Sequence, residues 1–210
     1  MGWFDFARSS DSPVIETRDI PLFPLEAVLF PGGLLPLKIF EQRYLDMAAA
    51  CLKDNKPFGI CLIARGDETG KPAEPHGVGT LAEIGNCEME QLGILQIIAR
   101  GGRRFRIIEA HSRADHLLQG RVEIIPDNGP LAMPPERQRL LPLLRRVVSD
   151  LGRERIPEPH HFDDAEWVGY RITEVLPIQN LAKQKLLELE DPLARLEILE
   201  KFLDQRQLLG

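Results

Sequence analysis

The stretch most suggestive of cofactor chemistry is GDETGKP at positions 66–72, where two glycines precede a lysine. A nucleotide-binding loop follows the order G-x-x-x-x-G-K-[ST], because backbone N–H groups and the lysine surround the phosphates while the hydroxyl holds magnesium. Here only three residues separate the glycines, and Pro72 stands where the hydroxyl is required. The stretch is therefore interpreted as an exposed loop rich in charge, glycine and proline, and the sequence predicts no cofactor.

A second group of residues with metal-binding chemistry lies near the start of a predicted helix. His160 and Asp164 fall one turn apart if this stretch is helical, and both are residue types that bind zinc. The alternative is that Asp163 and Asp164 complement the positive end of the helix dipole. No third ligand stands at a characteristic spacing, so the sequence favours the helix start and predicts no metal site.

Candidate nucleophiles form no recognisable motif. Cys51, Cys61 and Cys87 lie ten or more residues apart, which fits neither a C-x-x-C knuckle nor a disulfide framework, so we interpret them as small buried hydrophobic residues. No serine lies in a nucleophile-elbow pattern. The chain is predicted not to be an enzyme, although a cofactor-independent hydrolase stays open because catalytic groups meet in space rather than in sequence.

Basic residues gather around one aromatic residue between positions 100 and 106. Arg100, Arg103, Arg104 and Arg106 flank Phe105, a combination that binds phosphates and stacks a base. The net charge of −6 opposes nucleic-acid binding, and alternating arginine and apolar residues on a hairpin place the charges on its solvent face. RNA binding is therefore kept as an alternative function.

The elements that must position these residues differ between the two parts of the chain. Before residue 127 the apolar residues come in short runs bounded by Gly, Pro, Asn and Asp, which is typical of strands and turns. One amphipathic helix is predicted over residues 41–53. The predicted strands are residues 34–39, 58–64, 78–85, 92–99, 104–110 and 118–125. Many short strands with one helix indicate a closed or nearly closed antiparallel sheet.

After residue 127 the pattern becomes helical. Asn, Gly and Pro are frequent over residues 128–135, which predicts a boundary between a β-rich part, 14–127, and a helical part, 128–210. Helical stripes follow over residues 140–151, 163–175 and 180–189, and Asp191 with Pro192 announces another helix as N-cap and first helical residue. The predicted fold class is α+β, with a helical bundle at the C-terminal end.

Several ordered motifs resemble those of one known family. The segments PLFPL, FPG, PL and FEQRY occur at residues 21–25, 30–32, 36–37 and 40–44, and VGTLAEI, GRRFRI, LPI, KQ and DP follow at residues 78–84, 102–107, 176–178, 183–184 and 191–192. This order resembles the substrate-recognition domain at the N-terminus of ATP-dependent Lon proteases. The resemblance implies that the β-rich part is a PUA-like pseudo-barrel.

The resemblance also implies a function. A free-standing recognition module would bind unfolded or extended protein segments through exposed apolar patches or a sheet edge. Such a module would serve proteolysis or quality control as an adaptor, with a protease or chaperone as a further partner; cereblon resembles another use of this domain. The residues predicted to contact peptides are Phe30, Phe40, Tyr44, Arg104 and Phe105.

Composition agrees with a folded domain. Hydrophobic residues make up 43% and charged residues 28% of the 210 positions, near the averages for globular proteins. No apolar stretch is long enough to span a bilayer, and no signal peptide opens the chain. The predicted location is the cytoplasm, without membrane or nucleic-acid partners.

Overall fold

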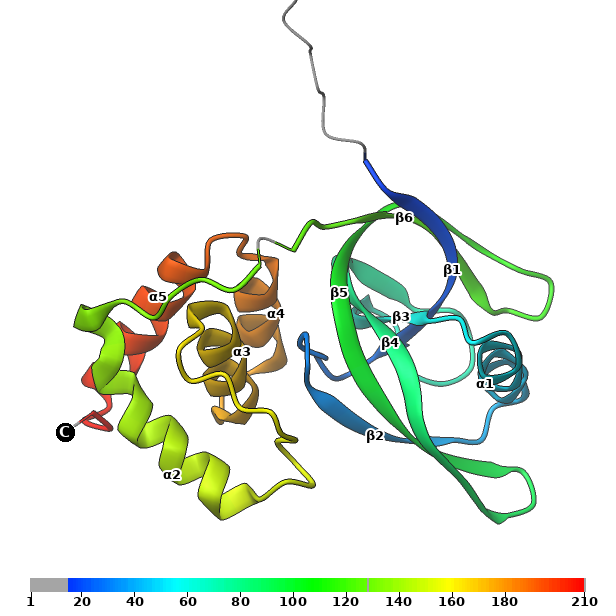
Figure 1. Ribbon diagram of the computed structural model, residues 1–210. Coiled ribbons are helices and arrows are strands. Elements are labelled where there is room, and N and C mark those ends of the chain that lie inside the picture. The colour runs from blue at the N-terminus through cyan, green and yellow to red at the C-terminus, as the bar shows by residue number, and fades with distance from the viewer. Residues whose placement is uncertain (1–14, 128, 210) are drawn as a thin grey trace, which may run out of the picture.

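The computed structural model describes residues 15–127 and 129–209, which form a β-rich part and a helical part lying side by side (Figure 1). The predicted start of the β-rich part, residue 14, lies outside the described residues. The fold mixes α and β structure, with one six-stranded sheet and five α-helices. The strands are β1 (Thr17–Leu25), β2 (Leu34–Ile39), β3 (Phe58–Arg65), β4 (Glu74–Gln91), β5 (Ile94–Ser112) and β6 (Leu118–Ile124).

Five of the strands form a closed ring. The strand order is β2-β5-β4-β3-β1-β6. An additional pairing between β5 and β6 closes the strands β5, β4, β3, β1 and β6 into a ring. β2 stands outside this ring, because it pairs with residues 95–100 of β5 while β6 pairs with residues 105–112 of the same strand. A single long strand therefore carries both the ring closure and β2.

The prediction of an antiparallel sheet was wrong for one pair of strands. β1 and β3 run parallel, with Leu22 opposite Gly59 and Leu25 opposite Leu62. The chain between them contains β2 and helix α1 (Gln42–Asp54), which is the long crossover connection that parallel strands need.

The prediction of two strands at residues 92–99 and 104–110 was also wrong, because β5 continues through Gly101 and Gly102. The glycine pair was interpreted as part of a hairpin. The structure gives Gly101 a different reason, since a Cβ atom there would lie 2.1 Å from the carbonyl oxygen of Phe30. Glycine permits this close approach of two backbone segments.

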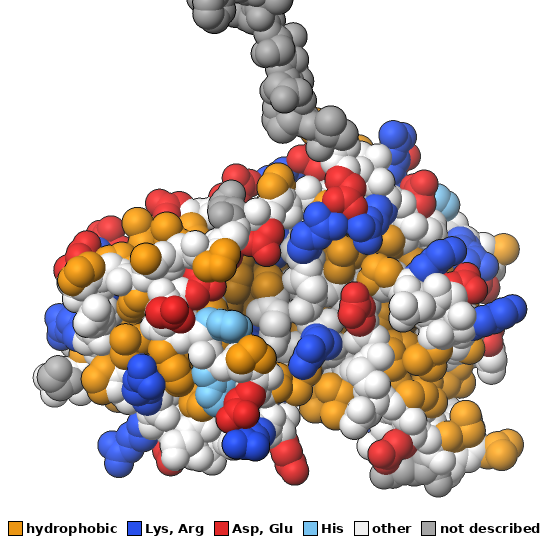
Figure 2. All heavy atoms as spheres, in the orientation of Figure 1, with side chains coloured by type: hydrophobic (Ala, Val, Ile, Leu, Met, Phe, Trp, Pro, Cys, Tyr) orange, Lys and Arg blue, Asp and Glu red, His pale blue; other side chains and the backbone are white. Residues whose placement is uncertain are grey.

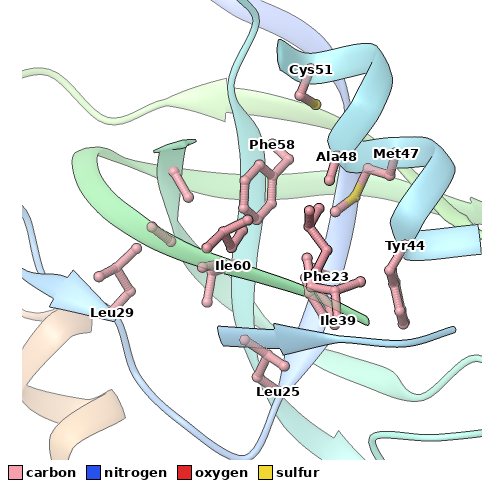
Figure 3. Close-up of a cluster of buried hydrophobic side chains, with 14 of the residues drawn as sticks. Phe23, Leu25, Leu29, Ile39, Tyr44, Met47, Ala48, Cys51, Phe58 and Ile60 are labelled. Carbon is pink, nitrogen blue, oxygen red and sulfur yellow. The ribbon is translucent and has the colours of Figure 1, made fainter. Parts of the chain in front are cut away.

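The core of the β-rich part is built where α1 packs against the strands (Figure 3). Tyr44, Met47, Ala48 and Cys51 line the buried face of α1. The helix was predicted correctly, but its buried face is rotated from the predicted apolar stripe, because Ala49 and Leu52 of that stripe are exposed. Figure 3 draws the buried side chains of α1 facing others from the strands, among them Phe58 of β3. A second cluster, which includes Leu22, Phe105 and Val122, draws buried residues from all five strands of the ring.

The helical part begins with the 3-10 helix η1 (Pro135–Leu140). It continues with the helices α2 (Leu141–Leu151), α3 (Ala165–Val175), α4 (Asn180–Glu188) and α5 (Pro192–Gln205). Pro142 stands in the first turn of α2, where its missing N–H leaves no intrahelical bond unmade. Asp164 and Asp191 cap α3 and α5, and Pro192 is the first residue of α5 as predicted. Among the described residues, no helix combines the length and hydropathy needed to cross a membrane.

Candidate functional site

The structure buries two of the predicted contact residues, Phe30 and Phe105, completely. The ring of Phe105 lies in the cluster formed by the five strands of the ring. Phe30, in the turn before β2, packs on Tyr170 of α3 with ring centroids 5.8 Å apart. Both aromatic rings therefore contribute to packing, and neither offers surface to a ligand in this conformation.

Tyr44 is buried as well, on the inner face of α1. Its ring stacks on Phe23 at a centroid distance of 3.9 Å, and the Arg43 guanidinium lies 4.6 Å from the ring centroid. Burial raises the pKa of the Tyr44 hydroxyl. Arg43 donates to the backbone oxygen of His116 and pairs with Glu41, so this arginine fixes the start of α1 against the β5–β6 connection.

Arg104 is the fourth buried residue of the predicted set, with 4% of its surface exposed. Its Nη1 atom donates to the carbonyl oxygens of Leu187 and Leu189, each at 2.8 Å. These carbonyls belong to the end of α4, whose last carbonyls lack intrahelical partners. Arg104 thus joins β5 to the helical part.

Phe40 alone among the five predicted residues is exposed, at 56%. It follows β2 directly and lines a groove of about 220 Å³ between β2 and the end of β1. Tyr44 lines the same groove, whereas Phe30, Arg104 and Phe105 do not. The structure therefore brings Phe40 and Tyr44 together and leaves the other three elsewhere. Peptide contact by these residues stays a prediction.

The remaining arginines of the 100–106 cluster are mostly held by carboxylates. Arg103 pairs with Glu16 at 2.9 Å, and Arg106 pairs with Glu190 at 2.9 Å and lies 3.7 Å from Glu123. The hydrogen bonds from Arg103 and Arg18 lower the pKa of the Glu16 carboxyl. The cluster thus divides into the buried Arg104, the carboxylate-paired Arg103 and Arg106, and Arg100, which is exposed.

The other chemically suggestive residues take structural positions. Asp164 accepts hydrogen bonds from the backbone N–H groups of Glu166 and Leu131, each at 3.1 Å, so its carboxylate is occupied as a helix cap. The His160 Nε2 atom lies 3.1 Å from the carbonyl oxygen of Ile156. Within residues 15–127 and 129–209 no three His, Cys, Asp or Glu side chains group in a metal-binding arrangement.

The cysteines divide by burial. Cys51 and Cys61 are buried, and burial raises the pKa of both thiols, which keeps them protonated and unreactive. Cys87 on β4 is exposed, contrary to its interpretation as a buried residue. β4 extends six residues beyond the predicted strand end at residue 85, from Asn86 to Gln91, and this extension carries Cys87 out of the core.

Sequence reasoning missed one exposed apolar feature, the tip of the β4–β5 hairpin. Leu92 is 98% exposed and Met89 is 64% exposed at this tip. The hairpin projects past β2 in Figure 1, and Figure 2 shows apolar side chains gathered on the same side of the β-rich part. The available signal was the pair Leu92-Gly93, because glycine favours a turn, and a leucine in a hairpin turn lies outside the core.

Comparison with known proteins finds relatives that match most of the chain. A solved structure, the Lon N-terminal domain protein from Xanthomonas campestris, is 33% identical, with a TM-score of 0.74 over 88% of this chain and 98% of that chain. Lon protease 2 of Myxococcus xanthus is 25% identical over 203 residues, which cover 90% of this chain and 24% of that protein. Protein cereblon of Xenopus tropicalis is 31% identical over 114 residues, covering 52% of this chain and 24% of that protein.

The chain thus spans about a quarter of the length of these curated relatives. The family match itself is nearly complete, because residues 19–205 match the family described as the ATP-dependent protease La (LON) substrate-binding domain. The motifs that suggested this resemblance, from the PLFPL segment to Asp191-Pro192, all lie within the matched range. The chain belongs to the LON substrate-binding domain family.

Proposed function

We propose that this chain is a non-catalytic recognition module that binds unfolded or extended polypeptide segments. The observation that carries the proposal is the apolar end of the β4–β5 hairpin, where Met89 near the end of β4 and Leu92 in the turn are both exposed. A large apolar side chain left in water favours contact with another apolar surface. Membership of a substrate-binding family supports protein segments as the ligand.

The finer parts of the proposal rest on the same family membership. We propose that the module acts as an adaptor, which hands bound segments to a protease or chaperone. Phe40, exposed beside the groove at β2, is retained as a direct contact. Phe30, Tyr44, Arg104 and Phe105 would act indirectly, by holding the strands and the helical part that present the surface.

The proposed architecture is a PUA-like pseudo-barrel over residues 14–127 and a helical bundle over residues 128–210. The ring of β1, β3, β4, β5 and β6 supports the first. The hydrophobic cluster shared by η1 and α2 to α5 supports the second, because most of its buried members come from those helices. No specific observation favours an RNA-binding or hydrolytic alternative.

The test is binding of the purified chain to a permanently unfolded protein, reduced and carboxymethylated α-lactalbumin, measured by fluorescence anisotropy. We expect binding that tolerates added salt, because apolar contact is not screened as charge pairs are. The double variant Met89→Ser/Leu92→Ser should weaken it by about tenfold or more, since two buried apolar side chains contribute over 1.4 kcal/mol.

The matched control is Leu181→Ser/Leu193→Ser, which removes two exposed leucines from the helical part. This control should leave the affinity within about twofold, a change of under 1 kcal/mol. Absence of binding to the unfolded protein would refute the proposal. Equal losses in both double variants would refute the assignment of the hairpin tip.

A further inference from the structure

β2 is an edge strand with one open side. Within the described residues it pairs with β5 alone, from Leu34 opposite Arg100 to Ile39 opposite Leu95. None of the backbone hydrogen bonds formed outside the regular elements of residues 15–127 and 129–209 involves residues 34–39. The outward row of peptide groups on β2 is therefore free to pair with another chain.

Pro36 fixes which peptide groups point outward. Proline has no N–H to donate, so we assign Pro36 and Ile98 as a non-hydrogen-bonded pair of the antiparallel ladder. In an antiparallel ladder such pairs alternate with hydrogen-bonded ones, so the neighbours Leu35 and Leu37 carry the bonds to β5. The open edge consequently presents N–H groups from Leu34 and Lys38 and carbonyl groups from Leu34, Pro36 and Lys38.

The open edge borders the groove of about 220 Å³ described above. Its floor is apolar, with Leu35 and Leu37 from β2 facing Phe23 and Leu25 from β1, and these side chains pack on the main core. Its rim is polar and includes Lys38 and Glu68. An extended chain laid along β2 would thus place alternate side chains over an apolar floor and the others in solvent.

The composition of the edge opposes pairing between two copies of β2. Proline and lysine on an edge strand discourage self-association, because proline removes a donor and lysine on both strands introduces repulsion. Pro36 and Lys38 are both exposed. The edge therefore suits a different chain, whose own donors can reach the Pro36 carbonyl and whose side chains carry no cationic charge.

We propose that the open edge of β2 binds an extended polypeptide by strand addition, with alternate apolar side chains of that polypeptide seated in the groove between β2 and β1. The proposal rests on the proposed function and names where and how the segment is held. Main-chain pairing supplies affinity that does not depend on sequence, and the groove supplies the preference for apolar side chains at every second position. This mode differs from capture by the hairpin tip, which involves side chains alone.

The first experiment uses a short fluorescent peptide in which valine and threonine alternate, with glutamate at both ends for solubility. Two N-methylated forms are compared, each methylated at one alternate set of residues. An added strand pairs through one of its edges, so methylation of one set should weaken binding by about tenfold or more while the other set leaves it within about twofold. Equal affinities for the two methylated peptides, or no binding of the parent peptide, would overturn the proposal.

The second experiment changes the protein at one outward donor. Lys38→Pro removes the Lys38 N–H, which points away from β5, while Lys38→Ala removes the same charge and keeps the N–H. We expect the proline variant to lose about tenfold in peptide affinity and the alanine variant to match the parent. Amide exchange of the unmodified protein is an independent readout, in which Leu34 and Lys38 should gain protection when the peptide binds.

The two proposals fail in distinguishable ways. Binding of unfolded α-lactalbumin that ignores Lys38→Pro, together with equal affinities of the two methylated peptides, would leave the recognition function standing and remove strand addition. Failure of the chain to bind unfolded α-lactalbumin would remove the recognition function itself. Loss of binding in both Lys38→Pro and Lys38→Ala would assign the effect to charge and overturn the role of the N–H group.

Discussion

Arg104 and Arg103 are neighbours on β5, yet only Arg104 is buried, at 4% exposure against 40% for the Arg103 side chain. Replacing Arg104 with methionine keeps most of the packing but leaves the buried Leu187 carbonyl oxygen without its side-chain donor and the Leu189 carbonyl oxygen with Arg195 alone. We expect Arg104→Met to lower the free energy of unfolding by about 2–4 kcal/mol, measured by urea denaturation.

The adjacent variant Arg103→Ala is the control for this prediction. It removes a partly exposed ion pair with Glu16, and such pairs contribute about 0–1 kcal/mol. A similar loss of stability in both variants would mean that the carbonyl contacts of Arg104 do not hold the two parts together.

Gly101 and Gly102 offer a comparison between two identical residues in different surroundings. A Cβ atom at Gly101 would lie 2.1 Å from the carbonyl oxygen of Phe30. The two backbone segments cannot easily move apart, because the Gly32 N–H donates to the Gly101 oxygen and the Gly101 N–H donates to the Gly33 oxygen. We expect Gly101→Ala to destabilise the fold by about 1–3 kcal/mol in urea denaturation followed by circular dichroism.

Gly102→Ala should leave stability within about 1 kcal/mol, because the nearest atom to its added Cβ is the Leu81 carbonyl oxygen at 3.5 Å, an ordinary contact. An equal cost at both positions would point to a general need for flexibility in β5. A cost confined to Gly101 would identify the close approach of the Phe30 carbonyl as the reason for glycine.

The elements of the fold could be predicted from the sequence where their signals are local. Pro192 after Asp191 predicts the start of α5, and the helical periodicity predicts the position of α1. The continuity of β5 through Gly101 could not be predicted, because the reason for this glycine is the distant Phe30 carbonyl. The contact residues were difficult for the same reason: the burial of Arg104 depends on Leu187 and Leu189, more than eighty positions away.

Two helix caps allow a prediction at the level of elements. The Asp164 carboxylate accepts from Glu166 at the start of α3 and also from Leu131 in the connection between the two parts, whereas the Asp191 carboxylate accepts only from Leu193 among the described residues. We expect Asp164→Ala to cost about 2 kcal/mol and Asp191→Ala about 1 kcal/mol, measured by thermal unfolding.

Asp163→Ala is the matched control for the caps. The Asp163 side chain is exposed, and its backbone oxygen, which accepts from Met133, is unchanged by the substitution. Its effect should lie within about 0.5 kcal/mol. An effect of Asp163→Ala as large as that of Asp164→Ala would assign the stability to negative charge near the helix start and not to the cap.

At the scale of the whole molecule, side chains join the two parts by donating to backbone carbonyls across the junction. Arg104 donates to the end of α4, Arg171 donates to Pro31 at 2.7 Å, and Gln184 donates to Val78 at 2.9 Å. Backbone acceptors have fixed positions, so they hold α3 and α4 in one orientation on the β-rich part.

Glu174 makes this junction sensitive to pH. Burial raises the pKa of its carboxyl above the ordinary value of 4.5, and the nearby Arg171, whose Nε lies 3.3 Å from Glu174 Oε2, only partly opposes the effect of burial. The folded state therefore holds this proton to higher pH than the unfolded state does. Its contribution to stability falls as pH rises from 4.5 through the raised pKa.

The stability difference between the parent and Glu174→Gln should therefore decrease as pH rises through that window, as measured by urea denaturation at a series of pH values.

Glu188→Gln is the control with the opposite expected pH dependence. Burial alone would raise the pKa of Glu188, but hydrogen bonds from Lys185 and Gln184 outweigh it and lower the pKa. The parent's advantage over Glu188→Gln should therefore be lost as pH falls, because a carboxylate held ionised stabilises the fold only above its unfolded pKa. Parallel pH profiles for the two variants would contradict the raised pKa of the buried Glu174, whereas profiles of opposite slope would show that the pKa values of Glu174 and Glu188 are shifted in opposite directions.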